Sequence, residues 1–158
     1  MIDAIDQKIL MILQENARTP NAEVARQLGM APSAIFERIK KLEERGVIRS
    51  YAAQIDPEAL DLALLAFVNV RTEDPVGSDA TARALAKRPE VQEVHHVAGE
   101  DCYLAKVRVK DTAALSRLMK EVGALPGVRA TRTTVVLETT KESSELPVQP
   151  KGTKKEKK

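Results

Sequence analysis

The segment 31–46, APSAIFERIKKLEERG, brings a hydroxyl group, an aromatic ring and several charges together in one predicted helix. Pro32 suits a first helical position, because its ring fixes φ and its missing N–H would be unpaired there in any case, and Gly46 suits the helix exit. One stripe of this helix is aliphatic and would face a core: Ile35, Ile39 and Leu42. The opposite face carries the side chains that could bind a ligand: Ser33, Phe36, Glu37, Arg38, Lys40 and Lys41.

These outward side chains suit double-stranded DNA as a partner. Lysine and arginine bind phosphates, a small hydroxyl near the helix start can reach a base edge in the major groove, and Phe36 offers an apolar contact to a thymine methyl. Two alternatives stay open. The face could be an ordinary solvated one with a Glu37–Lys41 ion pair at i,i+4 spacing, and Phe36 could pack in the core.

Two helical patterns precede this segment. An aliphatic stripe runs through residues 3–15, and a second helix is predicted from Thr19-Pro20 to Gly29, whose tight turn leads into the third. Three short helices with a glycine turn before the last are typical of a helix-turn-helix. We assign this DNA-binding domain to residues 1–50.

A strand-like pattern follows the third helix. Residues 47–55 alternate until Asp56-Pro57 breaks the run. We expect a connector, assigned as a linker strand over 51–62, or a wing beside the DNA. In the second case Arg49 would contact a phosphate.

Residues 63–140 alternate predicted strands with predicted helices. The predicted elements are a strand over 64–72, a helix over 78–87, strands over 91–97 and 103–109, a helix capped by Asp111, and a strand over 128–137. This βαββαβ order is the ferredoxin-like plan. The predicted fold class is therefore α+β, an N-terminal winged helix-turn-helix followed by a ferredoxin-like (RAM/ACT-like) domain.

The first of these strands predicts a self-pairing surface. Residues 64–70 are apolar at nearly every position, as in a strand covered on both faces, whereas a four-stranded ferredoxin-like sheet has helices on only one side. The simplest closed partner for the other side is a second copy. We expect an obligate homodimer through residues 63–140 that assembles further.

Composition and charge limit the class of protein. Hydrophobic residues make up 43% and charged residues 30% of the 158 residues, and no apolar run of about 18 residues is present, so no membrane span is expected. The N-terminal residues do not resemble a secretory signal, and the single Cys102 excludes an intrachain disulfide, so we expect a cytoplasmic location. The net charge divides into 8 − 7 = +1 for residues 1–50, 11 − 13 = −2 for 51–140 and 6 − 3 = +3 for 141–158.

The last residues, 141–158, predict a disordered basic tail, because they lack aromatics and have little to bury. Five of their lysines follow Pro150. These lysines would add a salt-sensitive, sequence-independent attraction to DNA, or they would only keep the chain soluble.

The chain resembles the Lrp/AsnC (feast/famine) family of transcription regulators over roughly residues 2–140. Four stretches carry the resemblance: Asp6 to Leu10; Arg38 to Glu43 with Gly46 to Ile48; Val97 to Gly99 leading to Tyr103-Leu104; and Thr131 to Thr133 before Val135-Val136. The resemblance implies a sequence-specific DNA-binding regulator whose βαββαβ domains pair through their sheets, often into tetramers or octamers. It also implies that an amino acid or related metabolite binds between such domains.

The effector-binding residues implied by the resemblance are Gly99, Glu100, Asp101, Cys102 and Tyr103 in one loop, with Thr131 and Thr133 on the last strand. The family's loop pattern is Gly-x-x-Asp-Tyr, and this chain departs from it. Cys102 stands where the aspartate is usual, and Asp101 lies one residue earlier. A carboxylate moved by one residue on a turn points in another direction, which changes how it would meet an effector's ammonium group.

Two other functions stay open. Sirohaem decarboxylases resemble the same two-domain layout, and in such an enzyme His95 or His96 would be the acid/base group while Arg108 and Arg132 would bind substrate carboxylates. An effector-independent architectural DNA-binding protein would use the lysine-rich tail. We expect no catalytic residue, metal or cofactor, because adjacent histidines on a strand point to opposite faces and the sequence contains no phosphate-binding loop or nucleophile motif.

Overall fold

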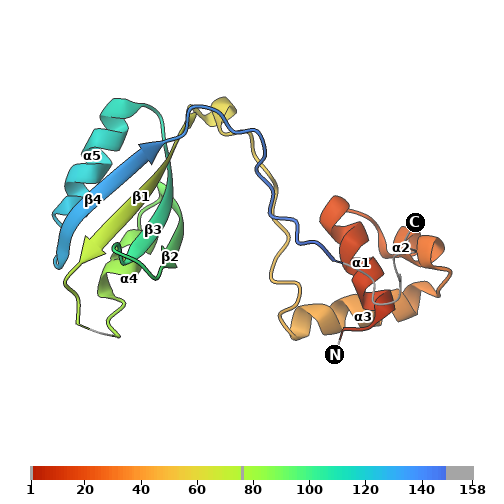
Figure 1. Ribbon diagram of the computed structural model, residues 1–158. Helices are drawn as coiled ribbons and strands as arrows, with labels where there is room; N and C mark the ends of the chain where they lie inside the picture. Colours follow the sequence, from red (N-terminus) through yellow and green to blue (C-terminus); the bar gives the residue numbers. More distant parts are fainter. Residues whose placement is uncertain (1, 76, 149–158) are drawn as a thin grey trace, which may run out of the picture. The chain divides into compact units, whose positions relative to one another are not determined.

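The structure, a computed structural model, describes residues 2–75 and 77–148 and contains two compact units (Figure 1). Among these described residues, unit 1 consists of 2–53 and 142–148, and unit 2 consists of 54–75 and 77–141. The chain therefore leaves unit 1 for unit 2 and later returns. No helix within the described ranges has the length and apolar character needed to cross a membrane.

Unit 1 is built on three helices: α1 (Ala4–Glu15), α2 (Asn21–Leu28) and α3 (Pro32–Glu44). A capping box starts α1, since the Asp3 side chain accepts the N–H groups of Ile5 and Asp6 while the Asp6 side chain accepts the N–H of Asp3. At the end of α2, Gly29 has φ 64°, a left-handed conformation that glycine adopts at little steric cost. The tight turn leads to Pro32 at the first position of α3, as predicted.

The aliphatic stripes of the three helices meet in one core: Ile9, Leu13, Val24, Ala25, Ile35, Ile39 and Leu42. Burying such a side chain stabilises the fold by about 1.5–3 kcal/mol relative to leaving it exposed. The core therefore fixes which side of α3 faces inward, and it confirms the helix-turn-helix prediction.

The segment after α3 differs from the prediction. Among the described residues no strand occurs between α3 and residue 64, and the only regular element there is the short 3₁₀ helix η1 (Glu58–Leu60). The N–H groups of Val47 and Ile48 donate to the carbonyl oxygen of Leu42 at 2.9 and 3.1 Å, so this backbone closes α3. A strand needs a neighbouring backbone to bond to, which alternation in the sequence does not provide. The strand predicted over 47–55, with the linker strand over 51–62, is wrong.

Unit 2 contains the elements β1 (Leu64–Thr72), α4 (Ala80–Ala86), β2 (Val91–His96), β3 (Tyr103–Val109), α5 (Thr112–Gly123) and β4 (Val128–Val135). They form one antiparallel sheet with the strand order β2-β3-β1-β4. This arrangement confirms the βαββαβ order and the α+β class. Asp111 caps α5 as expected, because its side chain accepts the N–H of Ala114 at 2.7 Å.

One face of this sheet packs against α4 and α5. The residues that share this core alternate along the two central strands and come from both helices: Ala66, Val68, Val70, Tyr103, Ala105, Val107, Val109, Leu85, Leu115, Leu118 and Val122. The intervening residues, which include Phe67, Asn69, Leu104 and Lys106, point to the other face and are half-buried. We call this second surface the open face of the sheet.

The predicted disordered tail is described only in part. Residues 149–158 lie outside the described ranges, whereas 142–148 belong to unit 1. There the backbone of Leu146 forms two hydrogen bonds with the side chain of Gln14.

Candidate nucleic-acid interface and effector loop

The solvent side of α3 gathers most of the predicted DNA-binding residues. We call it the outer face of α3 and define it by its exposed members: Ser33, Phe36, Glu37, Lys40 and Lys41. Phe36 is 52% exposed although its neighbour Ile35 is fully buried, so the alternative in which Phe36 packs in the core is wrong. Lys40 lies 3.9 Å from Glu44 in an exposed i,i+4 pair. Such pairs contribute little, so this contact would not keep Lys40 from a phosphate.

Arg38 lies at the edge of this surface and is bound from within unit 1. Its Nη1 atom is 2.7 Å from Asp3 Oδ2 and 2.7 Å from Asp6 Oδ1. The hydrogen bonds that Arg38 donates to Asp3 and then to Asp6 raise the pKa of Arg38. The Asp6 N–H, and then the Arg38 guanidinium, lower the pKa of Asp3. The same two carboxylates therefore cap α1 and tie it to α3, a role the sequence analysis missed although the Asp-x-x-Asp spacing is a capping signal.

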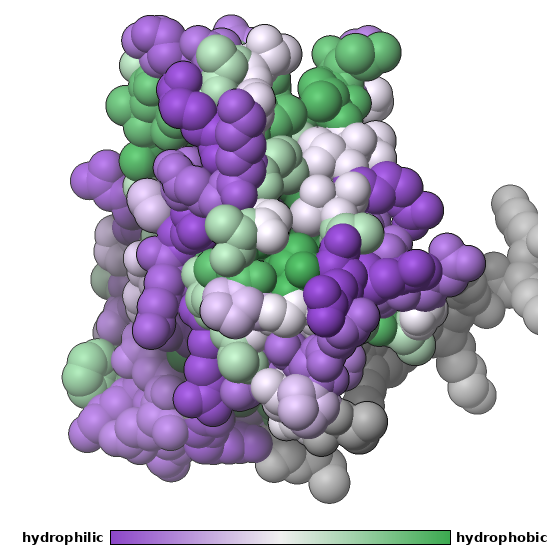
Figure 2. Space-filling model, turned by 90° about the vertical axis from the view of Figure 1, so that its left-hand side faces the viewer, coloured by the Kyte–Doolittle hydropathy of each residue, from purple (hydrophilic) through white to green (hydrophobic). Residues whose placement is uncertain are grey.

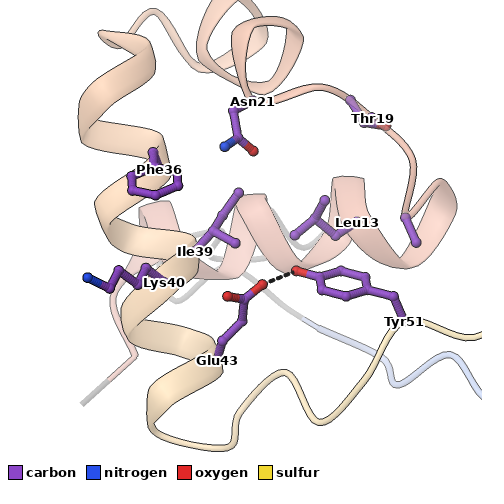
Figure 3. Close-up of a pocket in the computed structure, with 9 residues that line it drawn as sticks. Leu13, Thr19, Asn21, Phe36, Ile39, Lys40, Glu43 and Tyr51 are labelled. Atoms are coloured by element: carbon purple, nitrogen blue, oxygen red, sulfur yellow. Dashed lines mark hydrogen bonds between the residues drawn. The ribbon is translucent and has the colours of Figure 1, made fainter.

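A surface hollow of about 460 Å³ adjoins the outer face of α3 (Figure 3). Figure 3 shows Leu13 and Ile39 at the hollow, with Phe36 and Lys40 on one side and Tyr51 on another. Tyr51 donates a hydrogen bond from its hydroxyl to Glu43 Oε1 at 2.8 Å. Burial, and then the Glu43 carboxylate, raise the pKa of Tyr51 to about 12. This bond fixes the segment after α3, and the sequence offered no signal for it.

Charge on the N-terminal helical part of unit 1 is nearly balanced. Residues 1–53 contain eight Lys/Arg and seven Asp/Glu, a net charge of 8 − 7 = +1. Arg49 is exposed beyond the end of α3, outside any helix or strand. Attraction to phosphates must therefore come from individual exposed cations rather than from a strongly basic surface.

The predicted effector loop, residues 99–103, is tied to the sheet by its backbone. Cys102 donates its N–H to the Val70 carbonyl oxygen at 3.0 Å, and its own carbonyl oxygen accepts the Val97 N–H at 3.0 Å. The Cys102 thiol lies 3.7 Å from the Thr72 carbonyl oxygen. Cys102, in the position where the family has an aspartate, is thus half-buried and directed at backbone.

The carboxylate of this loop is already paired. Asp101 Oδ2 is 2.7 Å from Arg132 Nη2 on β4. The carbonyl oxygen of the preceding Glu100 accepts a hydrogen bond from Arg71 Nε at 3.2 Å. The loop therefore places an acid and a base side by side, a pairing that the sequence does not predict.

Three other predicted effector residues, Tyr103, Thr131 and Thr133, lie on the helix-covered side of the sheet. Tyr103 and Thr131 both pair with Val70 in the register of the sheet, so their side chains point to the same face as Val70. Tyr103 is buried and donates its hydroxyl to the Ser78 carbonyl oxygen at 3.2 Å, and Thr133 Oγ1 lies 3.1 Å from Met119 Sδ. Gly99 and Glu100 are exposed. The structure thus brings Asp101 and Arg132 together but directs Tyr103, Thr131 and Thr133 to the opposite face.

In the enzyme alternative, the histidines and Arg132 lie at opposite edges of the sheet, whereas Arg108 is on β3 beside the histidine strand. His95 Nε2 lies 3.1 Å from Glu93 Oε2, while the ring of His96 lies 5.2 Å from that of Tyr103. Both histidines are on β2, at the edge opposite the Arg132 strand β4. Three strand spacings of about 4.8 Å separate these edges, so the structure does not place Arg132 beside either histidine.

Comparisons with known proteins agree with this geometry. A family model described as a winged helix-turn-helix DNA-binding domain matches residues 2–49, and one described as the Lrp/AsnC ligand-binding domain matches residues 65–146. The HTH-type transcriptional regulator FL11 of Pyrococcus horikoshii is 42% identical over 147 residues, covering 93% of this chain and 97% of that protein. The leucine-responsive regulatory protein of Escherichia coli is 39% identical over 150 residues, covering 93% and 92%.

Solved structures give the same result. A transcriptional regulator from Neisseria meningitidis in complex with L-methionine superposes with a TM-score of 0.87 at 33% identity, covering 93% of this chain and 97% of that one. A feast or famine regulatory protein from M. tuberculosis, complexed with L-methionine, gives a TM-score of 0.86 at 34% identity, covering 92% and 99%.

Proposed function

Because the chain belongs to the Lrp/AsnC family of transcriptional regulators, we propose that the outer face of α3 contacts double-stranded DNA and that unit 2 responds to an amino acid. The proposed DNA contact rests on the difference between the two sides of α3. Its aliphatic stripe is buried, and its polar and aromatic side is exposed directly after the glycine turn. A helix presented in this way can enter the major groove.

The outer face supplies three kinds of contact in this proposal. Lys40 and Lys41, together with Arg49, bind phosphates and set the position of the helix. Ser33 and Glu37 reach base edges, and Phe36 contacts a thymine methyl. Arg38, which the sequence placed among the DNA contacts, is a positioning residue in this proposal, because two carboxylates already bind its guanidinium.

The experiment that tests this function is selection of genomic DNA fragments by the full-length protein, with and without a panel of amino acids. We expect enrichment of fragments that share one operator sequence. On that operator, Lys41→Ala should weaken binding and lower the salt dependence of the affinity, since one phosphate contact is lost. If no sequence were enriched, the proposed sequence-specific function would be wrong.

For the effector we propose the Asp101–Arg132 pair as the group that an amino acid meets. An amino acid carries an ammonium and a carboxylate, so it can bind Asp101 and Arg132 in place of their bond to each other. Gly99, Glu100, Cys102 and Tyr103 shape this loop in the proposal, with Thr131 and Thr133 behind it. The L-methionine complexes of two structural relatives support an amino-acid effector. If no amino acid alters DNA binding, the chain is an effector-independent DNA-binding protein.

We further propose a homodimer, and higher assemblies of it, paired through residues 63–140 by the open face of the sheet. The open face leaves Phe67 and Leu104 only half-buried, and Leu137 next to the end of β4 is 98% exposed. On the side of unit 2 that carries α5, Figure 2 also shows hydrophobic patches among hydrophilic side chains. Apolar patches of this kind mark association surfaces. Phe67→Glu places a charge on the open face and should shift the full-length protein toward monomer in sedimentation. An unchanged assembly would exclude this pairing surface.

We propose neither catalysis nor a cofactor, and we propose a cytoplasmic location. The relatives are named as transcriptional regulators, and the two histidines that a decarboxylase would use lie at the sheet edge opposite Arg132. Purified protein that binds DNA without binding sirohaem would separate the regulator from the enzyme.

A further inference from the structure

The chain passes between its two units twice, and a side chain of α1 fastens the second passage. The chain leaves unit 1 after residue 53 and returns to it at residue 142. Gln14, in the last turn of α1, donates Nε2–H to the Leu146 carbonyl oxygen at 3.1 Å and accepts the Leu146 N–H at Oε1 at 2.7 Å. The blue trace in Figure 1 ends beside α1. We call residues 142–148 the strap.

The strap is held by its backbone and not by its side chain. One amide group satisfies both backbone groups of Leu146, whereas the Leu146 side chain is 72% exposed, so hydrophobic burial does not fasten the strap. Just before it, the Ser143 hydroxyl accepts the N–H of Glu145 at 3.1 Å, which bends the chain locally. Gln14 is therefore a polar anchor, and removing its amide should release the strap.

The path from the sheet to this anchor is short. Among the described residues, no helix or strand lies between the end of β4 at Val135 and residue 148. The Val136 N–H donates to the Leu65 carbonyl oxygen at 2.9 Å, which fixes the chain on the sheet up to that point. From there to Leu146 the path has 146 − 136 = 10 residues. It spans at most about 35 Å, at about 3.5 Å per extended residue.

The first passage is longer and starts from another helix. It begins at Tyr51, whose hydroxyl is bound to Glu43 of α3, and ends at Leu64, where β1 starts. This path has 64 − 51 = 13 residues, three of them in η1. Its limit is roughly 41 Å, at about 3.5 Å per extended residue and about 2 Å per 3₁₀ residue. The strap is therefore the shorter tether, and the two tethers hold unit 1 at α1 and at α3.

We propose that the anchored strap is a second tether that restricts the orientations of the helix-turn-helix unit, so that the two α3 helices of a dimer fit one spacing of DNA half-sites. The proposal rests on the DNA-binding function and the homodimer proposed above. A unit held by one flexible passage can turn and reach half-sites at several spacings, whereas a unit held at two points reaches few. The strap thus makes the half-site spacing part of what the protein recognises.

The test measures the affinity of the full-length protein for a selected operator, for the same operator with five base pairs inserted between its half-sites, and for a single half-site. Five base pairs are about half a helical turn, so the insertion moves one half-site to the other side of the duplex. The wild type should lose about 10²-fold or more in affinity on insertion, because both half-sites are no longer bound at once. Gln14→Ala should lose only about tenfold, since its units can turn. Both proteins should bind the single half-site equally.

Two substitutions at the other end of the anchor provide matched controls. Leu146→Ala keeps the backbone groups and should lose as much affinity on insertion as the wild type does. Leu146→Pro removes the N–H and should tolerate the insertion as Gln14→Ala does. Hydrogen exchange at the Leu146 amide, measured without DNA, should be faster in Gln14→Ala than in the wild type, which reports the anchor independently of any DNA contact.

Each contrary result has a distinct meaning. The proposal is overturned if Leu146 exchanges faster in Gln14→Ala while the insertion costs this variant as much affinity as the wild type. Unchanged exchange would remove the anchor itself, and weaker binding of Gln14→Ala to the single half-site would place the role of Gln14 in the helical domain and not in the strap. If the wild type selects no operator, the DNA-binding function fails and the strap has no role in half-site spacing, even where exchange at Leu146 still depends on Gln14.

Discussion

The outer face of α3 and the loop 99–103 show two ways in which a chain can present a binding site. On α3 the candidate residues are exposed, and the one candidate with strong internal partners, Arg38, is held by Asp3 and Asp6. In the loop, the charged candidate Asp101 is already paired with Arg132, and Cys102 is bonded through its backbone. A ligand of α3 meets groups that need only lose water, whereas a ligand of the loop must exchange partners. Binding at α3 should therefore depend on which side chains are present, and binding at the loop on how readily a pair opens.

The largest expected effect separates two adjacent residues of α3. Ile35→Ala should lower the free energy of unfolding by about 2–5 kcal/mol, because it leaves a cavity in the core of unit 1. Phe36→Ala should leave unfolding nearly unchanged but weaken operator binding, since its ring is 52% exposed. Both variants are tested by denaturant unfolding and by operator affinity. If Phe36→Ala proved as destabilising as Ile35→Ala, Phe36 would be a packing residue and not part of an exposed binding surface.

Arg38 and Lys41 should separate stability from DNA binding in the same way. Arg38→Met should cost about 1–3 kcal/mol of unfolding free energy, since Asp6, 8% exposed, loses its charged partner. Lys41→Met, an exposed change, should alter stability by less than about 0.5 kcal/mol but lower the salt slope by about 0.9 per DNA-contacting chain. A lower salt slope in Arg38→Met as well would make Arg38 a phosphate contact after all.

The Arg38–Asp3 ion pair predicts how the stability of the protein changes with pH. The pKa of Asp3 is lowered below its ordinary 3.8, so its contribution to stability is present above that pH and is lost as the pH falls through the folded-state value. Acid unfolding curves of Arg38→Met should therefore be flatter than those of the wild type below about pH 4. If the stability of both proteins fell equally steeply below about pH 4, Arg38 would not influence the pKa of Asp3.

The sequence predicted the elements more fully than the contacts between them. The stripe of Ile35, Ile39 and Leu42 identifies the inner side of α3, because helical periodicity is a local property of the chain. The strand after α3 was predicted wrongly, because pairing depends on a backbone elsewhere. The Arg38–Asp6 and Asp101–Arg132 pairs join residues 32 and 31 positions apart, and a sequence alone does not show that their side chains meet.

A smaller effect is expected at the loop. Arg132→Gln should change stability by only about 0–1 kcal/mol, because the pair is largely exposed on its Arg132 side. It should nevertheless weaken amino-acid binding in titration calorimetry, since it removes the group proposed to bind the effector's carboxylate. Asp101→Asn is the matched substitution, since it removes the carboxylate proposed to bind the effector's ammonium group. Unaltered binding in both would place the effector elsewhere.

The smallest expected effect on stability is that of the Tyr51–Glu43 hydrogen bond. The pKa of Tyr51 is raised to about 12, so its contribution to stability is complete below the unfolded value near 10 and is lost as pH rises through about 12. Tyr51→Phe should remove one of the two phenol titrations of the chain and leave that of Tyr103. Spectrophotometric titration decides this, and a Tyr51 midpoint near 10 would show that the Glu43 bond does not form.

The central claim is that the outer face of α3 contacts bases, and thymine-to-uracil replacement in the operator tests it most directly. Each replacement deletes only a C5 methyl group, and a methyl buried against Phe36 is worth about 0.8 kcal/mol, or roughly fourfold in affinity. We predict one thymine per half-site at which the replacement weakens binding of the wild type by about that factor and leaves binding of Phe36→Ala unchanged. Equal losses for both proteins at every thymine would contradict the account.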